Sequence, residues 1–283
     1  MAKGPALLIL PALMAVRAFA GPTTTAPAPD YAQIGVPDQS AGRAAIEQVR
    51  EAGLSGAYYI EFVLSIIPRR GDERSIRGTL WGERNELGPV LRIVLDPGGA
   101  DERRWLIQGG PQPSAWRCAR GGPVGPAGFL EPLWDGSEAT AFDVEMPFLY
   151  WPDETLVGVN RVAGRPADDF LFRPPADFSA QHPDIAGVRA YVDTQYHFLP
   201  LTELMGANGL PLKTWTLVDV KKVAEAWIPK EFDVRNEATR DKTRLDVTGA
   251  AVNLSPPPSV FDPARLADDI SPPAPPQYVD FGD

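Results

Sequence analysis

The sequence predicts a mainly β protein, in which one N-terminal helix precedes about ten or eleven antiparallel strands that curl toward a barrel. Three observations lead to this fold class. After residue 56 the apolar residues alternate with a period of two, whereas the helical period is clear only once, before that point. Short breakers of Gly, Pro or Asn separate the alternating runs, which favours consecutive strands with tight turns. With 283 residues, of which 44% are hydrophobic, the chain can bury a core.

The first twenty residues have the three parts of an export signal. Lys3 supplies a short positive segment, and residues 6–16 are apolar but too short to span a bilayer. An Ala-Phe-Ala triplet then offers small residues for cleavage before Gly21. The alternative, the start of a buried helix, is disfavoured by the prolines in this segment. We therefore expect residues 1–20 to be a signal peptide, the protein to be periplasmic, and the mature chain to lack a transmembrane segment.

The proline content indicates the domain limits. The chain holds 31 Pro, above the usual share of about 5%, and the excess lies near the two ends. Residues 21–37 are rich in Pro and Thr, as is typical of a linker, and residues 268–283 form an acidic, Pro-rich tail that we expect to be flexible. The folded β domain is accordingly predicted over residues 38–267.

The first predicted element of this domain is a helix at about residues 39–52. Asp38 or Ser40 can cap its N-terminus, and Gly53 ends it. Apolar residues recur at helical spacing at Ala44, Ala45, Ile46 and Val49.

A strand follows the helix, because residues 57–67 alternate strictly. One face of this strand holds Tyr58, Ile60, Phe62, Leu64 and Ile66. Shorter alternating runs follow at residues 75–84, 89–96 and 103–110. Residues 119–137 predict a loop, and the apolar, aromatic residues 143–154 predict a short helix or a turn.

The second half of the domain predicts a series of hairpins. The first spans residues 154–174, with Gly164 near its turn. Asn208–Gly209 lies between two alternating runs and predicts a type I′ turn, because both residue types tolerate positive φ. Two further runs, at residues 226–236 and 242–254, complete the meander.

No residue pattern indicates catalysis or a metal site. The two histidines, His182 and His197, have no Cys or second His at metal-ligand spacing, and no Gly-x-Ser-x-Gly motif is present. Adjacent carboxylates such as Asp168–Asp169 point to opposite faces of a strand, so they are poor acid–base partners. We therefore predict no enzyme activity, no cofactor and no metal. A Ser-His-Asp site built from dispersed residues stays open as an alternative.

Charge and cysteine content narrow the class of partner further. A formal net charge of −10 makes the protein a poor ligand for nucleic acid. The one cysteine, Cys118, cannot form an internal disulfide. It is also far from the predicted cleavage point, so we expect no lipid anchor there.

The aromatic content raises the question of what fills the barrel. The chain holds seven Trp and twelve Phe, and a curled sheet has a concave face that side chains must fill or that holds a ligand. In one interpretation, the helix at residues 39–52 and the segment 146–151 fill the hollow. In the other, they cover it in part and leave a hydrophobic cavity.

An ordered series of features over residues 140–267 carries a resemblance to a known family. The series consists of Val162-Ala163-Gly164-Arg165, Val192-Asp193, Pro200-Leu201, Lys213 after a Gly-containing turn, Val220 and Val223 before Trp227-Ile228-Pro229, Thr243 to Val247, and Pro257 to Leu266. In this order the features resemble the periplasmic outer-membrane lipoprotein-sorting proteins of the LolA-like superfamily.

The resemblance implies a half-open antiparallel β-barrel of about 11 strands, with one N-terminal helix and a short helical lid. It also implies an exported soluble carrier or sensor that binds a lipid or lipoprotein acyl chain in a hydrophobic barrel cavity, without catalysis. Envelope proteins are further candidate partners. The carrier's lid-gating Arg has no matching position in this chain.

By parity and size, we expect a set of large apolar side chains to line the cavity. They are Phe62, Leu64, Leu80, Ile93, Phe148, Trp151, Phe172 and Trp215. Two alternatives to the carrier stay open, a structural or protein-interaction β module with a dry core and, with less support, an exported hydrolase. The ligand, the protein partner and the oligomeric state do not follow from the sequence.

Overall fold

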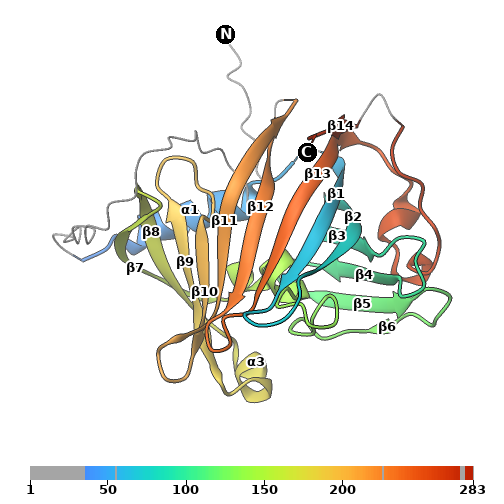
Figure 1. The fold of residues 1–283 in the computed structure, drawn as a ribbon. Helices are drawn as coiled ribbons and strands as arrows, with labels where there is room; N and C mark the ends of the chain where they lie inside the picture. The colour runs from blue at the N-terminus through green and yellow to red at the C-terminus, as the bar shows by residue number, and fades with distance from the viewer. Residues whose placement is uncertain (1–35, 55, 225, 275–277, 283) are drawn as a thin grey trace, which may run out of the picture.

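The computed structural model describes residues 36–54, 56–224, 226–274 and 278–282. The predicted signal peptide and nearly all of the predicted linker lie outside the described residues. Within them, the chain forms one curled antiparallel sheet of 14 strands (Figure 1). The fold class is therefore mainly β, as predicted, with few and short helices.

The strands run outward in two series from a central pair, β1 and β13. One series consists of β1 (Ala57–Ile67), β2 (Arg74–Asn85), β3 (Gly88–Leu95), β4 (Arg103–Gln108), β5 (Ser114–Ala119) and β6 (Gly125–Pro126). The other consists of β13 (Lys242–Leu254), β12 (Ala226–Asn236), β11 (Pro211–Val223), β10 (Leu201–Gly206), β9 (Ile185–Asp193), β8 (Arg165–Arg173) and β7 (Asp153–Val162). The edges of the sheet are β6 and β7, which do not pair with each other, so the barrel is half-open.

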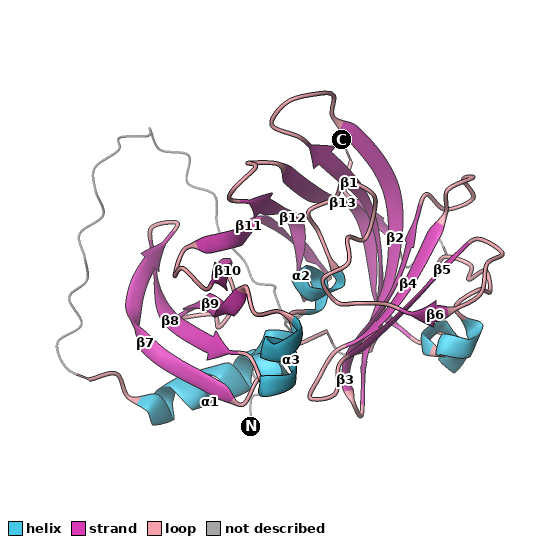
Figure 2. Ribbon diagram, turned by 90° about the horizontal axis from the view of Figure 1, so that it is seen from below, coloured by secondary structure: helices cyan, strands magenta, loops and turns pink. Residues whose placement is uncertain are grey.

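The helical segments lie in the connections. They are α1 (Gln39–Glu51), α2 (Ala141–Glu145), η1 (Pro147–Tyr150), α3 (Ala176–Gln181), η2 (Pro258–Phe261) and η3 (Pro263–Arg265). The link between the two series of strands crosses the concave side of the sheet and carries α2 and η1. Figure 2 shows α2 inside the curl of the sheet and α1 beside β7 and β8. The apolar segment 143–154 is thus short helix and turn, and it covers the hollow as a lid.

The edge of the sheet at β7 is covered by α1. The side chain of Asp38 caps this helix by accepting the N–H of Ser40 (2.8 Å). The amide of Gln39 then makes two hydrogen bonds with the backbone of Leu156. Its Nε2 donates to the carbonyl (2.8 Å), and its Oε1 accepts the N–H (3.0 Å). Because Leu156 lies on the free edge, at a bulge in β7, the Gln39 amide takes the place of a neighbouring strand.

The turn between β10 and β11 differs from the predicted type I′ turn. Gly209 has a positive φ of 76°, whereas Asn208 does not have a positive φ. Asn208 instead uses its carboxamide, whose Oδ1 accepts the N–H of Leu210 (3.0 Å). Short Asn side chains often bond backbone two residues on in this way. The prediction of the hairpin is confirmed, but its loop is longer and the pairing shifts between Leu204 and Met205.

The sheet has more strands than the number expected from the sequence. The additional ones include β6 and β14 (Val279–Asp280), which have two residues each. Two residues are too few to produce an alternating pattern, so β6 was predicted as part of the loop at residues 119–137 and β14 as part of the tail.

The C-terminal segment covers part of the convex face of the sheet. Residue 93 faces the hollow, so Arg92 on the same strand points to the opposite side. There its guanidinium donates to four backbone carbonyls, those of Val260 (3.2 Å), Arg265 (3.2 Å), Leu266 (2.9 Å) and Asp268 (2.5 Å). Further on, β14 pairs with β13. The described part of the predicted tail therefore contacts the sheet; its flexibility in solution stays a prediction.

Candidate ligand-binding cavity

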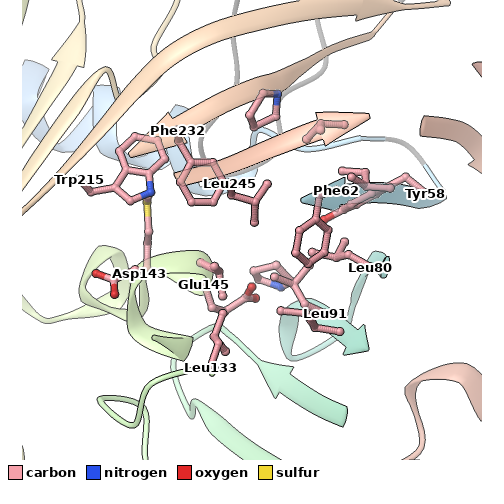
Figure 3. Close-up of a pocket in the computed structure, with 17 residues that line it drawn as sticks. Tyr58, Phe62, Leu80, Leu91, Leu133, Asp143, Glu145, Trp215, Phe232 and Leu245 are labelled. Atoms are coloured by element: carbon pink, nitrogen blue, oxygen red, sulfur yellow. The ribbon is translucent and has the colours of Figure 1, made fainter. Parts of the chain in front are cut away.

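A cavity lies between α2 and the concave face of the sheet (Figure 3). It is lined by Tyr58, Ile60 and Phe62 of β1, Leu80 of β2, Pro89, Leu91 and Ile93 of β3, Leu133, Asp143 to Met146, Trp215 of β11, Pro229 and Phe232 of β12, and Leu245 and Val247 of β13. The free space measures about 80 Å³. The lining is almost entirely apolar, so the cavity suits hydrocarbon rather than a charged solute.

Two glycines on β2 give the aromatic rings of β1 room at the cavity wall. Phe62 lies directly opposite Gly78, and Tyr58 directly opposite Gly82. A Cβ at Gly78 would come within 2.2 Å of the Phe62 ring, and one at Gly82 within 2.1 Å of the Tyr58 ring. Each ring therefore lies over a bare backbone position, where it packs against the sheet and still faces the cavity.

The opposite wall of the cavity comes from the second series of strands. The rings of Trp215 and Phe232 pack with centroids 5.4 Å apart. The pairing of β12 with β13 extends only over Glu231–Arg235, so the two strands separate beyond this range (Figure 1). Pro229 and Val247 line the cavity in the separated part. Pro229 has no N–H to donate, and at this position β12 makes no hydrogen bond to β13 that would need one. Farther along β13, at Gly249 and Ala250, the edge that β12 leaves is paired with β14.

The short helix α2 is built as a separate capped unit. Thr140 and Asp143 form a capping box, in which the Thr140 N–H and Oγ1 both donate to Asp143 Oδ2 (2.9 and 2.7 Å). Met146 ends the helix in the left-handed conformation, with φ of 49°. A five-residue helix is too short to be stable alone, so its place on the sheet depends on tertiary contacts.

Three strand residues fasten α2 and the residues before it to the sheet. Lys213 of β11 donates from Nζ to the carbonyl of Glu138 (2.7 Å) and to Asp143 Oδ2 (3.0 Å). Asn236 of β12 donates to Glu138 Oε2 (3.2 Å), and Thr243 Oγ1 of β13 accepts the Glu138 N–H (2.7 Å). We call these contacts the latch. These contacts are polar, and they add to the apolar packing of the lid, whose Phe142 and Met146 belong to the hydrophobic core.

Glu145, at the end of α2, and Asp143 are the two carboxyls in this lining, and Asp143 is held by Thr140 and Lys213 whereas Glu145 is not. It is only 1% exposed, and neither carboxyl oxygen has a hydrogen-bond partner among the described residues. The nearby N–H of Gly109 donates to the carbonyl of Pro89 instead (2.8 Å). Burial raises the pKa of Glu145 well above its usual range, and the charge of Arg84 opposes that rise. Burial in the cavity therefore favours the neutral form of this carboxyl.

The hydroxyl of Tyr58 shares this environment. Burial raises the pKa of Tyr58 well above its usual range, and the neighbouring Glu145 adds to the rise. Trp215 contributes a third polar group, because its indole Nε1 is buried and has no hydrogen-bond partner among the described residues. Trp215 also borders a second, smaller cavity of about 10 Å³ that contains Phe148 and Lys213.

The structure distributes the predicted lining residues over three places. Phe62, Leu80, Ile93 and Trp215 line the main cavity. Phe148 lines the smaller one. Leu64, Trp151 and Phe172 lie in the surrounding core, where Phe148 packs against both Trp151 and Phe172. The role of any of them in ligand binding stays a prediction.

Sequence reasoning missed several lining residues. Tyr58 lies on the same face of β1 as Phe62, so the alternation of side chains along the strand could have identified it. Leu91 has the parity of Ile93 on β3 and could have been found in the same way. Glu145 could not, because nothing in the short segment around it distinguishes a buried carboxyl from a solvated one.

The other polar candidates lie away from this cavity. His182 follows α3 and packs on the ring of Phe178 (4.7 Å between centroids). Asp169 pairs with Arg189 on the neighbouring strand. Cys118 is buried in β5, and burial raises the pKa of its thiol. Within the described residues, no group of three or more His, Cys, Asp or Glu is placed to hold a metal ion.

Comparisons with known proteins agree with this architecture. A family model described only as an uncharacterized protein matches residues 184–268. No curated protein matches the chain. Among solved structures, one described as an outer membrane lipoprotein-sorting protein domain from Vibrio parahaemolyticus is 16% identical, with a TM-score of 0.68 over 78% of this chain and 97% of that one.

Two further solved structures have the same fold. A DUF1329 family protein from Desulfovibrio piger is 16% identical, with a TM-score of 0.66 over 80% of this chain and 98% of that one. A LolA superfamily protein from Nitrosomonas europaea is 12% identical, with a TM-score of 0.61 over 78% of this chain and 96% of that one. The predicted resemblance is thus confirmed at the level of the fold, which this chain shares with these solved structures. In the described part of the chain, no helix is long and apolar enough to cross a membrane.

Proposed function

We propose that this protein is an exported carrier or sensor that binds a lipid or lipoprotein acyl chain in the cavity beneath α2, without catalysis. The observation that carries the proposal is an apolar cavity inside a half-open barrel, closed by a lid that polar contacts fasten. Burial of each CH₂ group contributes roughly 0.8 kcal/mol, so a sixteen-carbon chain gains on the order of 10 kcal/mol before the costs of binding. No reactive group is needed for this function.

The size of the cavity requires the lid to move. Its free space of about 80 Å³ is below the roughly 300–1,000 Å³ of typical ligand pockets. The latch offers a way to enlarge the cavity. Lys213, Asn236 and Thr243 can exchange their hydrogen bonds to Glu138 and Asp143 for bonds to water. Release of α2 would join the two cavities that Trp215 separates. We therefore interpret the structure as the closed state of a carrier.

The first experiment looks for the ligand itself. Protein purified from its native host is extracted under denaturing conditions, and the extract is analysed by mass spectrometry. We expect a stoichiometric lipid, and a mature chain that starts at Gly21 in the periplasmic fraction. Absence of lipid, together with no binding of a fluorescent fatty acid, would contradict the carrier function. A mature chain that keeps residues 1–20 would contradict export.

A matched pair of variants places binding in the cavity. Leu91→Trp fills the main cavity, whereas Leu87→Trp adds the same side chain at a position that is 59% exposed. We expect the first variant to lose fluorescent fatty acid binding while it keeps its circular dichroism spectrum, and the second to bind normally. Equal binding by both folded variants would place the ligand elsewhere.

A structural or protein-interaction module with a dry core is the second candidate. The small free volume of the cavity favours it. It predicts that a crystal structure of the protein from its native host has α2 in the closed position and no extra density in the cavity. Envelope proteins would then be its partners in place of lipids.

A further inference from the structure

The cavity contains polar groups that the chain itself does not satisfy. Both oxygens of Glu145 and the Nε1 of Trp215 are buried and lack hydrogen-bond partners among the described residues. Figure 3 shows the Glu145 carboxyl directed into the space between Leu245, Phe62 and Leu91. A purely hydrocarbon ligand would leave these groups unsatisfied, and an unpaired buried polar group is costly.

Glu145 has no evident structural task that would explain it. The N-terminus of α2 is capped by Thr140 and Asp143, and the lid is held by the latch, which acts through Glu138 and Asp143. Packing does not require a carboxylate either. The Glu145 side chain lies in space that is free because Gly109 has no side chain, and that space does not demand a charged group. An apolar residue at this position would fill the same space without the cost of desolvation. The carboxyl therefore indicates a ligand with a polar end.

The charges around the cavity indicate what kind of polar end fits. Among the described residues that line the two cavities, Lys213 is the one cation, and Glu138 and Asp143 already hold it. An anionic head group would thus find no free counter-charge. A cationic head group would find no free counter-charge either while the Glu145 carboxyl, whose pKa burial raises, keeps its proton. An uncharged head group avoids both costs.

We propose that the ligand of this cavity is an uncharged lipid with a hydroxyl group, and that this hydroxyl binds the carboxyl of Glu145. The inference rests on the proposed function, because it names the class of lipid. The neutral carboxyl donates its O–H to the oxygen of the ligand hydroxyl, and its carbonyl oxygen accepts the hydroxyl proton. The Nε1–H of Trp215 is a further donor to oxygen atoms of the same ligand.

The test is a competition among lipids that share one chain. The protein is incubated at neutral pH with an equimolar mixture of hexadecanol, hexadecanoic acid, hexadecylamine and 1-chlorohexadecane. The bound chains are then extracted and quantified by mass spectrometry. We expect hexadecanol to be enriched over the other three. Its enrichment over 1-chlorohexadecane, which has no hydrogen-bonding end, should fall about tenfold in Glu145→Leu.

Two further variants control the measurement. Glu145→Gln keeps a donor and an acceptor at the same place, so it should retain most of the enrichment. Glu51→Leu makes the same substitution as Glu145→Leu at an exposed position of α1 and should behave like the unchanged protein.

The outcomes separate the inference from the proposed function. If no chain is recovered with the protein, the carrier function itself fails. If chains are recovered but hexadecanol is not enriched, or is enriched equally in Glu145→Leu, the inference fails and the carrier function stands. Enrichment of the acid or the amine that depends on Glu145 would also overturn the inference, because it would assign a charged head group to the site.

Discussion

Arg92 and Glu145 are both buried ionisable residues, one on each face of the curled sheet, and each is only 1% exposed. On the convex face, Arg92 donates to four backbone carbonyls of the C-terminal segment. Burial, aided by the charge of Arg104, lowers the pKa of Arg92 to about 10, which still leaves it charged at neutral pH. On the concave face, Glu145 has no partner among the described residues.

The difference shows how the two faces of one sheet are used. The C-terminal segment covers part of the convex face, and Arg92 connects this segment to β3. Arg104 on β4 extends the connection, because it bonds the carbonyl of Ala267 (2.5 Å) and pairs with Asp269. The concave face is covered by the link that carries α2 and η1, and there both oxygens of Glu145 lack a partner among the described residues, whereas of the Arg92 guanidinium only Nε does. We infer that the convex face serves stability and that the concave face serves binding.

The largest expected effect comes from removing the hydrogen bonds that connect β3 to the C-terminal segment on the convex face. Arg92→Met leaves four carbonyls of the C-terminal segment without their donor, so we expect the free energy of unfolding to fall by at least about 3 kcal/mol. Urea denaturation measures this change. The matched control is Arg77→Met on β2, an exposed position where the change should stay within about 0.5 kcal/mol. Equal effects of the two substitutions would remove the contrast between the faces.

A smaller effect is expected from overfilling the concave face. Gly78→Ala places a methyl group against the ring of Phe62, which must tilt into the cavity. We expect a loss of about 1–3 kcal/mol of stability and weaker binding of a fluorescent fatty acid. Gly125→Ala is the control, because a Cβ there meets no atom within 4 Å. Full binding by a folded Gly78→Ala variant would show that the ring does not border the ligand.

The pH dependence of stability tests the state of Glu145. Because its pKa is raised in the folded state, the folded protein retains a proton that the unfolded chain loses above the ordinary Glu pKa. Stability should therefore fall as the pH rises from that value toward the raised one, by about 1.4 kcal/mol per pH unit. Glu145→Gln should lack this contribution, so its stability relative to the unchanged protein should increase with pH. Parallel pH profiles would mean that the carboxyl is solvated.

The smallest expected effect concerns the latch. Lys213→Met removes two hydrogen bonds that hold the lid, and we expect a loss of about 1 kcal/mol of global stability. Amide hydrogen exchange over residues 138–146 should become faster, while exchange in β1 and β13 stays unchanged. Lys230→Met, which breaks the pair with Asp246 on the neighbouring strands, is the control. Unchanged exchange in the lid would show that apolar packing alone holds it.

The sequence by itself determined the class of fold and the location of its elements. Alternation over residues 57–67 and 242–254, and helical spacing over residues 39–52, depend on which side chains face the core. These are local periodicities, so they can be seen without the structure. The Asn208–Gly209 hairpin was predictable for the same reason, although its turn type was not, because the Asn side chain rather than its φ shapes that loop.

The tertiary structure alone decided which large apolar residues border the cavity. Phe62, Leu64 and Phe172 have equivalent patterns in the sequence, yet Phe62 faces the cavity and the other two lie in the surrounding core. The outcome depends on what lies opposite, such as Gly78 across from Phe62. The burial of Glu145 was decided in the same way. A carboxylate in a five-residue helix is normally solvated, and only the crossing of α2 over the concave face removes water from it.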